Sequence, residues 1–286
     1  MHSGVSTPIR PMVFDQRPDI RLIVADMDGT LLDGNNRVHE HFWPLVTELH
    51  RQGILFCPAS GRQYFTLREQ FADIADDLVF IAENGSYVVR HGSEVSSDGL
   101  LAADAVRLID AMRVSIACGL DAGVVLCGKR SAYIERSDAA FLESVVPYYA
   151  ELTVVDDLLD VDDEFLKVSI YDFGAAEDTT APLLTGFRDS HTVRVSGEHW
   201  VDVTSSTANK GRAIRHLQQS VGIGPDQTMV FGDFLNDLEM MDAATFSFAM
   251  DNAHPELRER AGYLAPSNLE NGVVRTISSV LGLPWS

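Results

Sequence analysis

Three things are scarce in this sequence of 286 residues: cysteine, basic side chains and long apolar runs. The three cysteines, Cys57, Cys118 and Cys127, show no CxxC spacing, which argues against a zinc site and is typical of a reducing compartment. No apolar stretch approaches the roughly 20 residues that cross a membrane, and the first 20 residues contain no apolar core of a signal peptide. We therefore expect a soluble, cytoplasmic protein with no membrane partner.

Basic residues are outnumbered, because 22 Lys and Arg stand against 42 Asp and Glu, which gives a formal net charge of −20. Such a field repels polyanions, so nucleic acid is not an expected partner. A small phosphorylated ligand needs only a local cation or two and is not excluded. With 45% hydrophobic residues the chain can bury a sizeable core, and its length indicates one large or two modest domains.

Apolar runs alternate with helical patterns in the first and last parts of the chain. The runs are apolar nearly throughout, which is typical of parallel strands that are covered on both faces. The predicted strands are 22–26 (LIVAD), 54–60, 78–83, 228–233, 245–250 and 263–266, and the predicted helices are 38–53, 237–243, 254–261 and 272–281. This alternation predicts an α/β fold with a doubly wound parallel sheet.

The middle of the chain follows another pattern. A long helix is predicted over 102–117, and short alternating strands and further helices follow up to about residue 195. An α+β domain inserted into the α/β domain explains this pattern. We expect a flexible leader over 1–20, a core formed by 21–98 and 196–286, and the inserted domain over 99–195.

The stretch VADMDGTLLD places Asp26 and Asp28 at the end of the first predicted strand. Residues two apart on a strand point to the same side, so both can face one site if the extended conformation persists. Open α/β sheets bind ligands at such strand ends. Two adjacent carboxylates repel, which calls for a proton or a cation between them. An ordinary polar strand end is the structural alternative.

The stretch PASGR again follows an apolar run directly, with Ser60, Gly61 and Arg62. A hydroxyl and the backbone amides beside a glycine can bind an anion, and Arg62 can support such a site. A plain turn between a strand and a helix explains the same residues equally well.

Lys210 stands at the start of an amphipathic helix in ANKGRAIRHL. A cation is unfavourable there, because a helix N-terminus carries partial positive charge. The placement is reasonable if Lys210 and the helix N-terminus bind one phosphate together. The alternative is a lysine exposed to solvent.

The stretch VFGDFLND ends another apolar strand and supplies Asp233, Asn236 and Asp237. Carboxylates at a rigid strand end suit Mg²⁺, which prefers oxygen ligands. Capping of the following helix is the structural alternative.

In this order, DxDGT, S-G-R, a lone lysine and GDxxND resemble the motifs of the haloacid dehalogenase (HAD) superfamily of phosphotransferases. Further stretches resemble its Cof-type branch (subclass IIB): ENGS (83–86), NKG (209–211), MMDAA (240–244) and 249–273. Residues 118–149 look like the cap domain of bacterial sugar phosphatases. The resemblance covers nearly all of the chain beyond residue 20. It implies a Rossmann-like core whose α+β cap lies between Ser60 and Lys210, at the position called C2, and closes over the site.

The resemblance also implies roles for the motif residues. Asp26 would be the nucleophile that forms an aspartyl phosphate, and Asp28 the general acid and base. Mg²⁺ would be held by Asp26, Asp233 and the backbone carbonyl of Asp28. Asp237 would orient Lys210 or a water molecule on the metal, and Arg62 would support the site. The residues that would bind the phosphoryl group are Ser60, Gly61, Lys210 and Asn236.

The function predicted from these motifs is a Mg²⁺-dependent phosphatase for small phosphorylated metabolites, above all sugar phosphates, acting as a monomer or small homo-oligomer. A phosphomutase of the phosphomannomutase type is the alternative enzyme, since it resembles this chain in the DxDGT motif and the cap position. A module that binds ligand without turnover is a third class. Hydrolysis of p-nitrophenyl phosphate that depends on magnesium separates the enzymes from the binding module.

Overall fold

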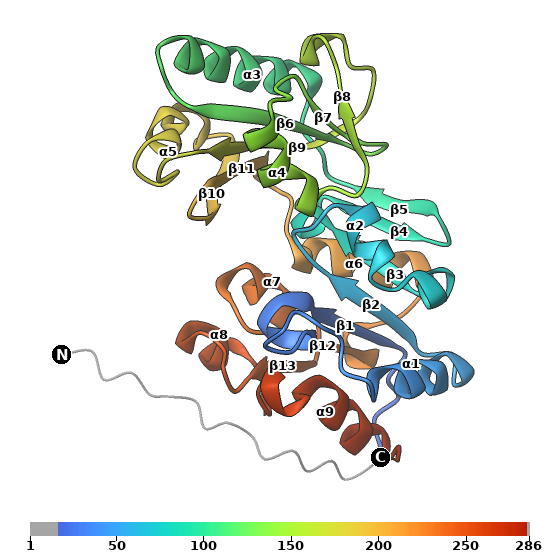
Figure 1. Ribbon diagram of the computed structural model, residues 1–286. Helices are drawn as coiled ribbons and strands as arrows, with labels where there is room; N and C mark the ends of the chain where they lie inside the picture. Colours follow the sequence, from blue (N-terminus) through green and yellow to red (C-terminus); the bar gives the residue numbers. More distant parts are fainter. Residues whose placement is uncertain (1–16, 285–286) are drawn as a thin grey trace, which may run out of the picture. The chain divides into compact units, whose positions relative to one another are not determined.

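The computed structural model describes residues 17–284, which form two compact units (Figure 1). The first unit comprises residues 17–60, 73–96 and 209–284, and the second comprises 61–72 and 97–208. The expected leader, 1–20, lies outside the described residues except for its last four. Among the described residues, no helix combines the length and the apolar character needed to cross a membrane.

The first unit is built on an eight-stranded sheet with the order β14-β13-β12-β1-β2-β3-β4-β5. Its strands are β1 (Leu22–Asp26), β2 (Leu55–Ala59), β3 (Val79–Ala82), β4 (Tyr87–Arg90), β5 (Ser93–Ser97), β12 (Thr228–Gly232), β13 (Phe246–Met250) and β14 (Tyr263–Ala265). The six strands from β14 to β3 are parallel, and β4 runs antiparallel to β3. Strand β1 lies between β12 and β2, so segments far apart in the sequence meet at its two sides.

Helices cover both faces of this sheet, which explains why its parallel strands are mostly apolar. All five residues of β1 are buried. Helix α1 (Phe42–Arg51) packs against α9 (Gly272–Leu281), whereas α6 (Lys210–Val221), α7 (Leu238–Met241) and α8 (Pro255–Arg260) form a second group (Figure 1). The predicted Rossmann-like, doubly wound fold is confirmed.

The second unit has a six-stranded sheet with the order β10-β11-β9-β6-β7-β8. Its elements are α2 (Tyr64–Glu69), α3 (Ala102–Ala117), β6 (Ala122–Gly128), β7 (Ala132–Ile134), α4 (Ala139–Val145), β8 (Leu152–Val154), β9 (Phe165–Asp172), α5 (Thr180–Leu183), β10 (His191–Gly197) and β11 (Trp200–Ser205). Alternate side chains of β9 enter two clusters. Val168 and Ile170 pack with residues of α3 and α5, whereas Tyr171 packs with Phe141 of α4. This alternation is typical of a sheet that is mostly antiparallel.

The second unit extends beyond the expected boundary at residue 195, because that boundary falls inside β10. Strand β11 pairs with β10 and β9, so Trp200, which lies in the range 196–286 expected for the core, belongs to this sheet. Its indole packs near the rings of Tyr148, Tyr149 and Tyr171. A strand's partner across 30 residues of sequence is not visible in its own hydrophobic pattern.

Candidate active site

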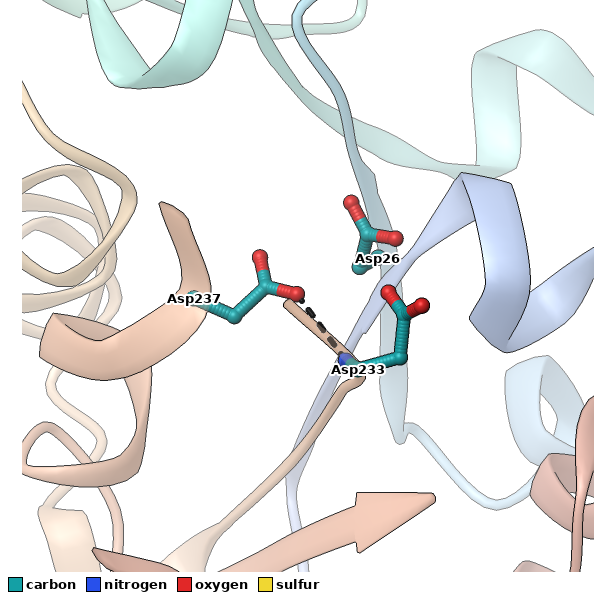
Figure 2. A group of neighbouring side chains, drawn as sticks. All are labelled: Asp26, Asp233 and Asp237. Atoms are coloured by element: carbon teal, nitrogen blue, oxygen red, sulfur yellow. Dashed lines mark hydrogen bonds between the residues drawn. The ribbon is translucent and has the colours of Figure 1, made fainter. Parts of the chain in front are cut away.

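Two neighbouring parallel strands carry the central carboxylates. Asp26 is the last residue of β1, and Asp233 directly follows β12, which pairs with β1. Since the carboxyl ends of parallel strands meet at one edge of a sheet, the two side chains lie close together. Asp237 closes the short turn after Asp233, and Figure 2 shows the three side chains converging.

The three carboxylates form one compact group. One oxygen from each of Asp26, Asp233 and Asp237 lies within 4.8 Å of the others. Asp26 and Asp237 are buried, and Asp233 is partly buried. The Asp233 amide donates to Asp237 Oδ2 at 3.1 Å, as Figure 2 shows, which fixes the backbone that carries both acids.

Lys210 supplies positive charge to this group. Its side chain is 1% exposed, and its ammonium donates to Asp26 and, at 2.7 Å, to Asp237 Oδ1. Lys210 is the first residue of α6, whose start is capped by the side chain of Asn209. Two carboxylates compensate for the unfavourable position of a cation at a helix start, so the alternative of a solvent-exposed lysine is wrong.

The pKa values reflect a shortage of positive charge. Burial raises the pKa of Asp26 well above its ordinary value, and Asp237 and Asp233 raise it further, whereas Lys210 opposes them. Burial, with Asp237, also raises the pKa of Asp233 to about 6. Burial alone would lower the pKa of Lys210, but Asp237 and Asp26 hold it above its usual value. The Lys210 ammonium is therefore charged. The three carboxylates together can carry more negative charge than this single positive charge neutralises.

The donor set fits a divalent metal ion. When all three carboxylates are ionised, they and the Lys210 ammonium carry a net charge of −2, which one divalent cation neutralises. Carboxylate oxygens are also the ligands that hard cations such as Mg²⁺ prefer. Both oxygens of Asp237 accept hydrogen bonds, from Lys210 and from the Asp233 amide. Asp26 and Asp233 are therefore better placed to bind the metal directly.

Strand β1 ends at Asp26, whose own backbone is still extended, so the expected same-side arrangement of Asp26 and Asp28 does not follow from a continuing strand. A tight turn follows over Met27–Leu31, with Asp28 exposed and outside the group of three carboxylates. The backbone of Gly29 is left-handed, at φ 74°, and a Cβ there would collide with the Asp233 carboxylate. Thr30 Oγ1 donates to Asp233 Oδ1 at 3.4 Å. The turn is thus fitted closely against Asp233.

The predicted phosphate-binding residues of the first unit are connected through Asn84. The buried Ser60 accepts a hydrogen bond at its carbonyl from the Asn84 amide, at 2.9 Å, and Asn236 Nδ2 donates to Asn84 Oδ1 at 3.4 Å. A Cβ on Gly85 would collide with the backbone of Asn209, just before Lys210. The turn over Glu83–Gly85 therefore packs against three of the predicted motifs.

Gly61 and Arg62 belong to the second unit. There the Gly61 carbonyl accepts a hydrogen bond from Lys167 Nζ at 3.3 Å. Both residues are partly buried. Their expected part in phosphate binding stays a prediction.

Sequence patterns did not identify Thr30 and Asn84 as residues of the site. The contact of Thr30 with Asp233 joins two motifs that lie about 200 residues apart in the sequence. Asn84 and Gly85 both have positive φ angles, of 54° and 99°. The Asn-Gly pair in ENGS is a typical signal for such a turn and could have pointed to it.

Comparison with known proteins places the chain among phosphatases. A family model described as haloacid dehalogenase-like hydrolase matches residues 23–277. The 5-amino-6-(5-phospho-D-ribitylamino)uracil phosphatase YbjI of Escherichia coli (strain K12) is 34% identical over 269 residues, which cover 92% of this chain and 96% of that protein. YcsE of Bacillus subtilis (strain 168), named for the same activity, is 24% identical, over 91% of this chain and 95% of that protein.

Solved structures agree in fold. A haloacid dehalogenase-like hydrolase from Bacteroides thetaiotaomicron superposes with a TM-score of 0.80 at 20% identity, covering 91% of this chain and 99% of that one.

Proposed function

We propose that this chain, which belongs to the haloacid dehalogenase-like hydrolase family, removes phosphate from small phosphorylated metabolites with Mg²⁺. It is a phosphoric monoester hydrolase of that type. In the proposed mechanism, the reaction passes through an aspartyl phosphate on Asp26. The observation that carries the proposal is the group of Asp26, Asp233 and Asp237 around Lys210, in which only Asp233 is partly exposed. It combines a carboxylate nucleophile, a cation and the oxygen ligands of a metal at one sheet edge.

In the first step, a carboxylate oxygen of Asp26 attacks phosphorus, and the bond from phosphorus to the leaving oxygen breaks. Asp28 gives its proton to that oxygen, so the leaving group departs as an alcohol. Lys210 stabilises charge on the phosphoryl oxygens. Mg²⁺, held by Asp26, Asp233 and the backbone carbonyl of Asp28, would neutralise phosphate charge and keep Asp26 ionised.

In the second step, Asp28 is a carboxylate and takes a proton from water as the water oxygen attacks phosphorus. The bond between phosphorus and Asp26 breaks, which releases inorganic phosphate and restores both acids. Ser60 and Asn236, which Asn84 links, hold the phosphoryl group in both steps. Asp237 keeps Lys210 in place through its 2.7 Å hydrogen bond.

The proposed substrates carry phosphate on the primary alcohol of a polyhydroxylated chain, as hexose 6-phosphates do. The names of YbjI and YcsE describe a phosphate on a ribityl chain, which has the same chemistry at the reacting end. The proposal therefore covers sugar phosphates and ribitylamino phosphates alike. The alternative is a phosphomannomutase-type enzyme, which would return the phosphoryl group to a sugar.

The test is a screen of purified protein against a few dozen phosphorylated metabolites with and without Mg²⁺. We expect steady release of inorganic phosphate from primary-alcohol phosphates, ranked by kcat/KM, with no isomeric sugar phosphate formed. Isomer formation that requires a sugar bisphosphate would instead support the mutase. No hydrolysis of any ester, p-nitrophenyl phosphate included, would contradict the proposal.

A further inference from the structure

The tight turn that carries Asp28 is tied by two asparagine side chains from the far end of the chain. Asn252 Nδ2 donates to the Gly29 carbonyl at 2.8 Å. Asn268 Nδ2 donates to the Leu32 carbonyl at 2.9 Å. The two contacts lie at the middle of the turn and just beyond its end, because the turn spans Met27–Leu31.

The two asparagines are also joined to each other. The Asn268 amide donates to Asn252 Oδ1 at 3.1 Å. The Asn252 side chain therefore uses both its donor and its acceptor. Asn252 follows β13, and Asn268 follows β14, the next strand of the sheet. The result is a continuous hydrogen-bonded connection from Gly29 through Asn252 and Asn268 to Leu32, which we name the asparagine brace.

The conformation of the turn shows what the brace holds. Asp28 has φ −76° and ψ 124°, and Gly29 has φ 74° and ψ 0°, which are close to the angles of a type II β-turn. On one side, Thr30 donates to Asp233 and Gly29 lies against the Asp233 carboxylate. Asn252 holds the Gly29 carbonyl from another element. The turn that orients Asp28 is thus fixed by Asp233 on one hand and by the brace on the other.

Burial alone does not account for the brace. Asn252 is exposed and Asn268 only partly buried, so water could satisfy their amides. Each bond contributes about 0.5–1.5 kcal/mol at most in such a setting. The brace instead fixes the orientation of the turn. Without it, the peptide between Gly29 and Thr30 can rotate and change the direction of the Asp28 side chain.

We propose that Asn252 and Asn268 are positioning residues, which aim the Asp28 carboxyl at the leaving oxygen. This inference rests on the proposed function, in which Asp28 is the general acid. A purely structural role of the brace predicts something else: a loss of stability, or a loss of activity that is the same for every substrate.

The experiment measures the rate of enzyme phosphorylation in the pre-steady state with two esters, a hexose 6-phosphate and p-nitrophenyl phosphate. The sugar alkoxide needs a proton, whereas p-nitrophenolate scarcely does. General acid catalysis is worth about 10²- to 10⁴-fold, so a misdirected Asp28 should lose part of this factor. We expect Asn252→Ala to slow the reaction of the sugar ester about 10- to 100-fold and that of p-nitrophenyl phosphate about 3-fold or less.

A double-mutant comparison sharpens the test. In an Asp28→Asn background, Asn252→Ala should cause no further loss, about 2-fold at most, because the group it positions is already gone. Asp251→Asn is the matched control, since it weakens an exposed contact with Arg258 beside Asn252 and leaves the turn untouched. Its rates should equal those of the wild type.

Asn268→Ala is the second variant, should Asn252→Ala not fold. It should show the same preference for the good leaving group with a smaller loss. Equal losses with both esters, or a further loss in the Asp28→Asn background, would overturn the inference while phosphatase activity of the wild type stands. Failure of the proposed function itself is seen separately, as a wild-type protein that hydrolyses neither ester.

Discussion

The charge cluster around Lys210 in the first unit and the network around Arg113 in the second differ in burial. In the first, Lys210, Asp26 and Asp237 are buried together at the end of a parallel sheet. In the second, Arg113 joins two carboxylates with about a third of its side chain exposed. Exposed ion pairs add little to stability, whereas an excess of buried like charges opposes folding.

The difference indicates that the charges of the first unit serve its chemistry at a cost in stability. A metal-free first unit holds carboxylates whose pKa values are raised, because burial and mutual repulsion disfavour their charged forms. Perturbed carboxylates at a strand end are typical of functional sites. In the second unit, the Arg113 pairs hold the pKa of Asp157 below its ordinary value, which favours the charged form.

Lys210→Met should have the largest effect. Removing the buried ammonium leaves the Asp26 and Asp237 carboxylates without their positively charged partner, which should destabilise the protein by about 3–5 kcal/mol. Turnover should fall by about 10²- to 10³-fold or more, since a charged donor to the phosphoryl group is lost. Urea denaturation and kcat measure the two effects.

Lys129→Met in the second unit is the matched control, because its partner Glu164 is 79% exposed. It should cost about 1 kcal/mol or less and leave kcat unchanged. Similar losses of stability for the two lysine variants would remove the contrast between the units.

Asp233→Asn should separate stability from function within the first unit. The pKa of Asp233 is raised to about 6, so its ionised form is disfavoured without metal, and the amide should not destabilise the metal-free protein. Mg²⁺ should raise the Tm of the wild type, by the equivalent of about 3 kcal/mol at a hundredfold excess over Kd. The variant should show neither this shift nor metal-dependent turnover. A normal Tm shift with Mg²⁺ in the variant would exclude Asp233 as a ligand.

Arg113→Ala should have the smallest effect. Its contacts with Glu135 and, at 2.6 Å, with Asp157 are partly exposed, so their loss should cost about 1 kcal/mol or less. Neither kcat nor the response to Mg²⁺ should change. Equilibrium unfolding in urea measures the change in stability. A loss above about 2 kcal/mol would show that this network stabilises the second unit more than exposed ion pairs usually do.

Much of the first unit could be predicted from the sequence, because each parallel strand is a run of mostly apolar residues. The expected strand 22–26 coincides with β1, and the expected helix 102–117 of the second unit coincides with α3. The motif residues Asp26, Asp233 and Asp237 come together because their strands are neighbours.

Contacts between distant segments could not be predicted in this way. The hairpin of β10 and β11 joins the second sheet through β9, and nothing in its own pattern names that partner. The links from Asn252 to Gly29 and from Asn236 to Asn84 depend on the same long-range placement. The fit of the turn Met27–Leu31 against Asp233 depends on long-range placement too, because Gly29 and Asp233 are far apart in the sequence.

The central claim is that Asp26, among the buried charges of the first unit, is the nucleophile. The stereochemical course at phosphorus tests it most directly, with a primary-alcohol phosphate made chiral by oxygen isotopes and hydrolysed in labelled water. Two in-line displacements, first by Asp26 and then by water, predict retention of configuration. Inversion would mean a single direct attack by water and would contradict the account.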